Sequence, residues 1–232
     1  MKFYPFSDMQ RAHQIKFRIN SNIFRRTAML ICFFSITLQT MAQESLYKRF
    51  TELHYPVKLW VITHPFVAKK AMTLSLEARN EAEQRIEDPD LDGDFAGGQV
   101  DAFRHVFWMS YLTANIGPRK ARKLGQAYER SNKIDFKKKI LEDRYLPDFM
   151  ASEMDLENNE TGIRLGIENI VASKNELIQK AKQTVLEGKA VIIKKNIDGQ
   201  FLNSLGEIIP PEEHLGLWFS SKALVPSNFK RP

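Results

Sequence analysis

The sequence predicts a mainly α-helical fold, in which a compact helical domain surrounds one buried central helix and a small β-hairpin lies near the C-terminus. The segment from residue 97 to 116 is apolar on every side except for a few ionisable residues, which is typical of a helix inside a core. Apolar residues recur at helical spacing on both sides of it, over residues 66–86 and 118–130. We therefore expect the helices that begin at Phe66 and Pro118 to sandwich the central helix.

The first 42 residues have the pattern of an export signal peptide. Basic residues precede an apolar run from Ala28 to Leu38, and the tripeptide that ends at Ala42 offers a cleavage site. A membrane anchor is the alternative, but the run is shorter than the roughly 20 residues that a spanning helix needs. We expect the mature chain to begin near Gln43 and to form a single domain over residues 43–232. It would have no transmembrane anchor and would be periplasmic or extracellular.

The charge balance changes once this segment is removed. Six of the 34 Lys and Arg residues and one of the 28 Asp and Glu residues precede residue 43, so 28 basic and 27 acidic side chains remain, a net charge of about +1. The basic excess of the whole chain therefore belongs to the export signal, and we expect no nucleic-acid partner. The single cysteine, Cys32, lies in the same segment, so the mature chain has no disulfide, thiolate metal site or cysteine nucleophile.

The elements before the central helix follow from spacing and from proline. Residues 44–54 fit a short amphipathic helix, and residues 57–63 alternate as either a strand or an extended lead-in. Pro65 stands where a helix can begin, and residues 66–86 carry Ala, Met, Leu and Glu at helical spacing. This helix ends in an acidic loop.

The acidic loop before the central helix matches part of a calcium-binding loop. Asp88, Asp90, Asp92 and Gly93 repeat the spacing at which alternate side chains converge on one hard cation. Gln99 stands where such a loop has a bidentate glutamate. The alternative is an acidic turn that the N-terminal dipole of the next helix stabilises. Calcium at these three aspartates and a plain turn both stay open.

The central helix carries three ionisable side chains inward. Asp101 and His105 are four residues apart and lie on one helix face, and Arg104 sits beside them. An ionised group that is buried without a partner costs several kcal/mol. These side chains must therefore meet complementary groups from other parts of the chain.

The following helix offers one such group. A Gly-Pro break and a short turn predict an antiparallel helix over residues 118–130, which returns Glu129 towards Arg104 or His105. The basic stretch over residues 133–139 fits a solvated loop or a helix start.

A second polar cluster consists of Asp155, Asn158 and Asn159, and it precedes a helical segment that Thr161 opens. Adjacent asparagines commonly cap helices or make turns. That role accounts for one asparagine more easily than for both together with Asp155, so we expect the cluster to contribute to the site.

The C-terminal third begins with a helix. Ser173 and Glu176 form a capping box for a helix that ends near Gly188. Residues 190–195 fit a strand, and residues 197–200 fit a turn into a second strand, which makes the small hairpin.

The assembled motifs resemble an uncharacterised family of small bacterial domains. The family pattern is DAFRH, an aromatic residue soon afterwards, a His-Glu pair and MDLxNNxxG, and this chain matches it over residues 97–166. Tyr128 stands where the histidine of the pair is expected. The resemblance implies where the site lies, but it implies no activity.

Two functions of different classes fit this site. One is a hydrolase of the bacterial envelope, in which His105 is a general base or a metal ligand and a divalent cation activates water. The other is a non-catalytic binding or structural module, in which a buried polar network holds the helices together. The partner stays open, and the alternatives are an envelope lipid, peptidoglycan and a protein. The candidate catalytic residues are Asp101, Arg104, His105, Glu129, Asp155, Asn158 and Asn159.

Overall fold

The computed structural model describes residues 48–141 and 145–232. Residues 54–232 form one compact unit, whereas residues 48–53 belong to a separate one, in which residues 48–52 are helical. The predicted export signal lies outside the described residues. Among the residues described, no helix is both long enough and apolar enough to cross a bilayer.

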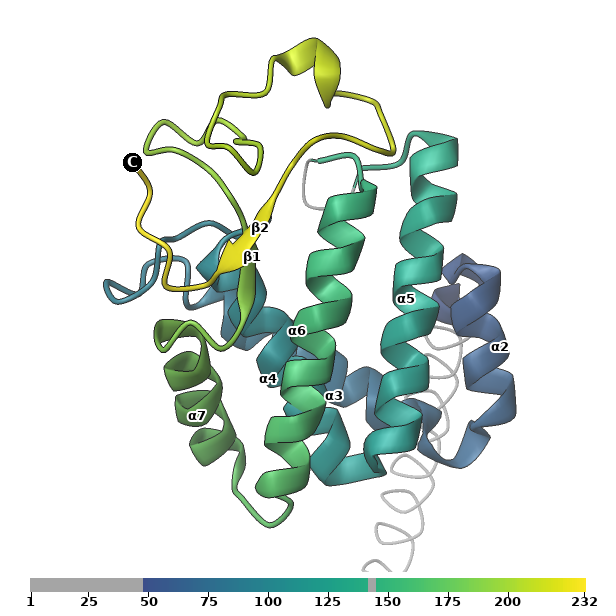
Figure 1. The fold of residues 1–232 in the computed structure, drawn as a ribbon. Helices are drawn as coiled ribbons and strands as arrows, with labels where there is room; N and C mark the ends of the chain where they lie inside the picture. Colours follow the sequence, from purple (N-terminus) through teal and green to yellow (C-terminus); the bar gives the residue numbers. More distant parts are fainter. Residues whose placement is uncertain (1–47, 142–144) are drawn as a thin grey trace, which may run out of the picture. The chain divides into compact units, whose positions relative to one another are not determined.

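The compact unit is built mainly from α-helices that surround α4 (Figure 1). Helix α4 contacts α3, α5, α6 and α7, and its contact with α6 is the most extensive. The predicted helical fold around one buried central helix is therefore confirmed. In chain order the α-helices are α2 (Tyr55–Thr63), α3 (Pro65–Glu83), α4 (Gln99–Ile116), α5 (Pro118–Lys138), α6 (Phe149–Glu168) and α7 (Lys174–Leu186).

Helix α4 is the core of the unit because it buries side chains around most of its circumference, and only the face of Arg104, Tyr111 and Asn115 is half-buried. Phe103, Phe107, Met109 and Leu112 have no exposed surface. Burying a large apolar side chain contributes about 1.5–3 kcal/mol, so this helix supplies much of the hydrophobic stabilisation. A polar side chain on α4 consequently reaches only other parts of the protein or a pocket.

Glycines on α6 let that helix approach α4 closely. A Cβ atom at Gly162 would lie 2.4 Å from the carbonyl oxygen of Val106, and one at Gly166 would lie 2.7 Å from that of Ser110. The two glycines and the two carbonyls are each one helical turn apart, so α6 runs along a backbone groove of α4. This contact brings the polar residues of α6 opposite those of α4.

A two-stranded antiparallel sheet follows α7. Strand β1 (Val191–Ile193) pairs with β2 (Leu224–Pro226), with Ile192 opposite Val225. At the turn predicted after residue 195, Lys195 and Phe201 form an isolated antiparallel bridge. The strand that pairs with β1 is instead β2, which lies close to the C-terminus. The residues between the strands, which include the 3-10 helix η1 (Pro211–Glu213), form long loops on the side of α4 where α4 begins (Figure 1).

Two expectations about local structure are corrected. Residues 57–63 lie in α2, because Val57 and Trp60 are buried on one helix face and the indole Nε1 of Trp60 donates to Lys120 O at 3.1 Å. Burial of that face outweighs the alternating pattern. The basic stretch after residue 132 continues α5 to its last residue, Lys138, and Lys139 caps the helix in a left-handed backbone conformation.

The start of α6 is also corrected. It begins at Phe149, because the carboxylate of Asp148 caps it by accepting from Ala151 N at 2.9 Å. The second polar cluster therefore lies in the middle of a helix and does not form a turn.

Candidate functional site

Asp101 lies in the first turn of α4, and its carboxylate is held from several directions. Its Oδ2 accepts from the backbone N–H of Gly97 at 2.7 Å. Its Oδ1 accepts from Arg104 Nη2 at 2.6 Å and from Arg104 Nε at 3.1 Å. The guanidinium group in turn lies over the Phe95 ring, 5.4 Å from its centroid. These contacts fix the position of the carboxylate at the N-terminal end of the helix.

His105 lies one turn further along α4 and is 2% exposed. Its Nδ1 is 3.0 Å from Asn159 Oδ1. Because an amide oxygen only accepts, Nδ1 carries the proton and donates to it. This bond fixes the orientation of the ring, and it points Nε2 away from Asn159.

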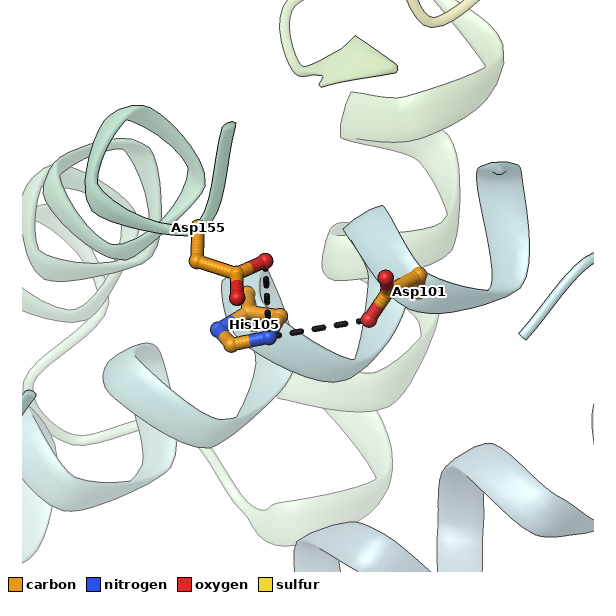
Figure 2. Close-up of side chains that lie close together, drawn as sticks. All are labelled: Asp101, His105 and Asp155. Carbon is orange, nitrogen blue, oxygen red and sulfur yellow. Dashed lines mark ion pairs between the residues drawn. The ribbon is translucent and has the colours of Figure 1, made fainter. Parts of the chain in front are cut away.

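The other ring nitrogen faces two carboxylates. His105 Nε2 is 3.1 Å from Asp155 Oδ1 and 3.6 Å from Asp101 Oδ1 (Figure 2). Asp155 comes from α6 and the other two residues from α4, so the close approach of these helices creates the cluster. Within residues 48–141 and 145–232, this is the one group of three or more His, Cys, Asp or Glu side chains whose ligand atoms lie close enough to share a cation, all within 4.8 Å of one another.

A pocket of about 120 Å³ opens onto this cluster. Asp101, Arg104 and Asp155 line it, whereas His105 lies behind the two carboxylates. Phe95, Phe201 and other apolar side chains form much of the remaining wall. A bound group would therefore meet the carboxylates first and would be screened from water by apolar walls.

A second charged pair lines the same pocket. The Nζ of Lys222 donates to Asp148 Oδ2 at 2.5 Å, and it lies 3.8 Å from the centroid of the Phe201 ring. His214 also lines the pocket, and burial, together with the nearby Lys222 charge, lowers the pKa of this imidazole. His214 is therefore mostly neutral at pH 7.

Glu129 and Asn158 are buried, and each makes a side-chain hydrogen bond of its own. Glu129 accepts from the Asn132 side chain at 3.0 Å and is not in the group of three that could share a cation. The amide of Asn158 exchanges two hydrogen bonds of 2.9 Å with the backbone of Val191, so it attaches β1 to α6. Tyr128, in the position where the family histidine was expected, packs edge-on against Trp108 at 5.2 Å.

The acidic loop has basic partners from the protein itself. Lys182 Nζ lies 2.8 Å from Asp88 Oδ1 and 2.7 Å from Asp90 Oδ2. Arg231 Nη2 lies 2.6 Å from Asp92 Oδ2, and that aspartate also accepts from Gln99 N. Asp88 and Asp90 thus pair with the lysine, whereas Asp92 pairs with the arginine. Calcium binding stays a prediction, and it would require the ion to displace these partners.

Sequence reasoning missed the pair of Asp148 and Lys222. These residues are 74 positions apart, and no motif connects them. The one available signal was the charged side chain of Lys222 within the apolar C-terminal segment. The pairing itself depends on the path of the long loop between the strands.

The comparisons with known proteins identify one relationship. The family model described as "Domain of unknown function (DUF6973)" matches residues 58–189, more than half of the chain, and this range contains Asp101, His105 and Asp155. The predicted resemblance to a family without known activity is thereby confirmed. No curated protein and no solved structure matches the chain.

Proposed function

Because the chain belongs to the Domain of unknown function (DUF6973) family, whose description assigns no activity, we propose a function from the site itself: a hydrolase that uses a divalent metal ion. The observation that carries this proposal is the group of Asp101, His105 and Asp155, whose ligand atoms lie within 4.8 Å of one another behind a pocket.

The ligand types fit a catalytic metal site. Two carboxylates and one imidazole suit hard or borderline cations such as Mn²⁺, Mg²⁺ or Zn²⁺. Three protein ligands leave coordination positions open, and catalytic sites keep such positions for water and substrate. The carboxylates line the pocket, so the open positions would face the space that a substrate enters.

Residues around the group hold the ligands in place. Asn159 accepts from the Nδ1 of His105 at 3.0 Å, so the lone pair of Nε2 points at the two carboxylates. A second partner of this kind orients the imidazole in most metal sites that contain histidine. Arg104 and the Gly97 amide orient Asp101 in the same way. When bound, a divalent ion would lower the pKa of a water molecule and supply a nucleophile near neutral pH.

Metal titration tests the proposal. Isothermal titration calorimetry with Mn²⁺ and Zn²⁺ should give one site per chain, and the Asp101→Asn, Asp155→Asn double variant should weaken binding at least about a hundredfold. Asp135→Asn is a matched control, because Asp135 also pairs with a histidine, His54, at 2.6 Å but is not in the group that could share a cation. Equal affinity in the parent and the double variant, or no binding at all, would exclude the metal site.

A non-catalytic module is the second candidate, and the contacts between α4 and α6 favour it, since His105 of α4 lies 3.1 Å from Asp155 Oδ1 and 3.0 Å from Asn159 Oδ1. If His105 is doubly protonated, the two cations His105 and Arg104 balance the two carboxylates Asp101 and Asp155, and the cluster is neutral without a metal. The cluster would then join α4 to α6 as a buried polar network. In that case the parent protein would bind no metal, and each single deletion would lower stability.

We also infer that the protein acts in the cell envelope. The support is the sequence pattern of the first 42 residues, with its basic region and its apolar run. Intact-mass measurement on protein recovered from the host should give a chain that begins near Gln43. A full-length chain in the cytoplasm would contradict export.

A further inference from the structure

His214 is the one histidine that lines the pocket among the residues described. It follows the 3-10 helix η1, and its backbone N–H donates to Pro211 O at 3.2 Å. Within residues 48–141 and 145–232, neither ring nitrogen of His214 has a hydrogen-bond partner. A neutral imidazole has one N–H and one lone pair. Both are therefore available to a molecule in the pocket.

A ring contact fixes where this imidazole lies. His214 packs edge-on against Phe201, with the ring centroids 5.0 Å apart. Lys222 Nζ lies 3.8 Å from the centroid of the Phe201 ring, and Lys195 Nζ lies 5.2 Å from it. A cation over an aromatic face is attracted to it, so the two lysines hold Phe201 in place. His214 is consequently placed by a side chain that is itself held in the pocket wall.

The surroundings of His214 keep it able to accept a proton. Burial and the Lys222 charge lower the pKa of the imidazole, while the charges of Asp148 and Glu212 raise it. The net effect is a lowered pKa, so the ring is mostly neutral at pH 7. A neutral imidazole accepts a proton, and an imidazolium with a lowered pKa gives the proton up readily.

His105 is placed differently. Its Nδ1 donates to Asn159, and its Nε2 faces Asp101 and Asp155 behind the pocket. His214 is not in the group that could share a cation, although it lines the same pocket as the two carboxylates. The pocket has a volume of about 120 Å³, so it holds only a few water molecules or one small group. A molecule that meets the carboxylates therefore shares this small space with His214.

We propose that His214 is the general acid–base of the site, which takes a proton from the attacking water and returns it to the leaving atom. This inference rests on the proposed function, because the ion held by Asp101, His105 and Asp155 is what places the water in the pocket. The family model ends at residue 189, so His214 belongs to a part of the chain that the model does not cover.

The proposed step conserves protons and electron pairs. As the water oxygen attacks the substrate, one O–H bond breaks, its electron pair stays on the oxygen, and the proton goes to a ring nitrogen of His214. The bond to the leaving atom then breaks, and that atom keeps the electron pair and takes the proton from the imidazolium. A proton donor of this kind serves leaving atoms that are strong bases, so the substrate is an amide or an alkyl ester.

Binding of acetohydroxamic acid tests the proposal without turnover. This small acid binds a metal ion as its anion, so it must lose a proton. Protein recovered from its host is loaded with Zn²⁺, and calorimetry at pH 7 in buffers that differ in their heat of ionisation counts the protons released. We expect the parent to release almost none, because His214 takes the proton, and His214→Gln to release about one per chain. Equal proton release by the parent and the variant would overturn the proposal.

A second variant and a control accompany this measurement. His214→Phe keeps a ring against Phe201 but cannot take a proton, so it should release protons as His214→Gln does. Both variants should bind Zn²⁺ with the parent affinity, and a loss of affinity would make His214 a metal ligand and overturn the proposal. His64→Gln is the matched control and should match the parent, because the Nδ1 of His64 donates to Trp60 O at 2.9 Å and His64 does not line the pocket.

The Zn²⁺ titration is read first, so the two proposals fail separately. No Zn²⁺ binding by the parent would overturn the proposed function and this inference together. Zn²⁺ binding without acetohydroxamate binding would overturn this inference alone, because the pocket would then not admit an acid to the ion.

Discussion

The approach of α6 to α4 gives a test of how the site is assembled. Gly162 of α6 faces α4 where a Cβ would lie 2.4 Å from Val106 O and 2.8 Å from Met109 Cβ. The first contact is with a backbone atom of a buried helix, so no side-chain rotation relieves it. Gly162→Ala must therefore move one helix away from the other.

The size of the effect follows from these distances. An ordinary contact begins at 3.4 Å, so α6 must move by about 1 Å. Overpacking of this kind costs about 1–3 kcal/mol, while alanine recovers up to about 1 kcal/mol of helix propensity. We expect a net loss of about 1–2 kcal/mol in the free energy of unfolding, which corresponds to a fall in Tm of about 2–8 °C.

The same movement changes the site. Asp155 lies on α6 two turns before Gly162, at 3.1 Å from His105 Nε2. A shift of about 1 Å would spoil the ligand geometry, and we expect Mn²⁺ affinity to fall about tenfold or more. Gly166→Ala, one turn further from Asp155, should cost similar stability with less effect on the metal.

Urea unfolding and calorimetry on the same preparations measure both effects. Glu157→Ala, on the exposed face of α6, is the control and should change neither quantity. A Gly162→Ala protein with parent stability and parent metal affinity would refute the argument that the glycine groove sets the site.

Other predictions concern the cluster, the acidic loop and pH. His105→Ala, Glu129→Ala and Asp155→Ala should each lower the free energy of unfolding by about 1–3 kcal/mol if the network is structural, whereas in an active site at least one should leave it unchanged or raised. If the loop binds calcium, chelator should lower the Tm, and Asp90→Ala with Asp92→Ala should abolish the response; an unchanged Tm in the parent would leave a plain turn. Lys182 holds the pKa of Asp88 below its ordinary value of 3.8, so this pair stabilises the fold above that pH and the contribution is lost as the pH falls through the lowered pKa. Lys182→Gln should therefore be less stable than the parent at pH 7 and approach it in acid, and a difference independent of pH would contradict this linkage.

Residue patterns alone predict the helical fold, the central helix and most of the cluster. The helix over residues 97–116 has apolar side chains on all of its faces, so it must be buried. Asp101 and His105 are four residues apart, and this spacing places both on one helix face. Helix capping accounts for one asparagine of the second polar cluster, but not easily for two asparagines together with Asp155. This surplus predicts that Asp155 and an asparagine lie in the same site as Asp101 and His105.

Which of these groups meet depends on how the helices pack. Asp155 and Asn159 reach His105 because Gly162 and Gly166 let α6 lie against the α4 backbone, whereas Asn158 bonds to the backbone of β1. These pairings depend on distances of a few tenths of an ångström between helices, and no residue pattern encodes such distances. The pocket likewise depends on a long loop that joins two strands 30 residues apart, and the path of that loop is set by contacts with the assembled helices rather than by local spacing.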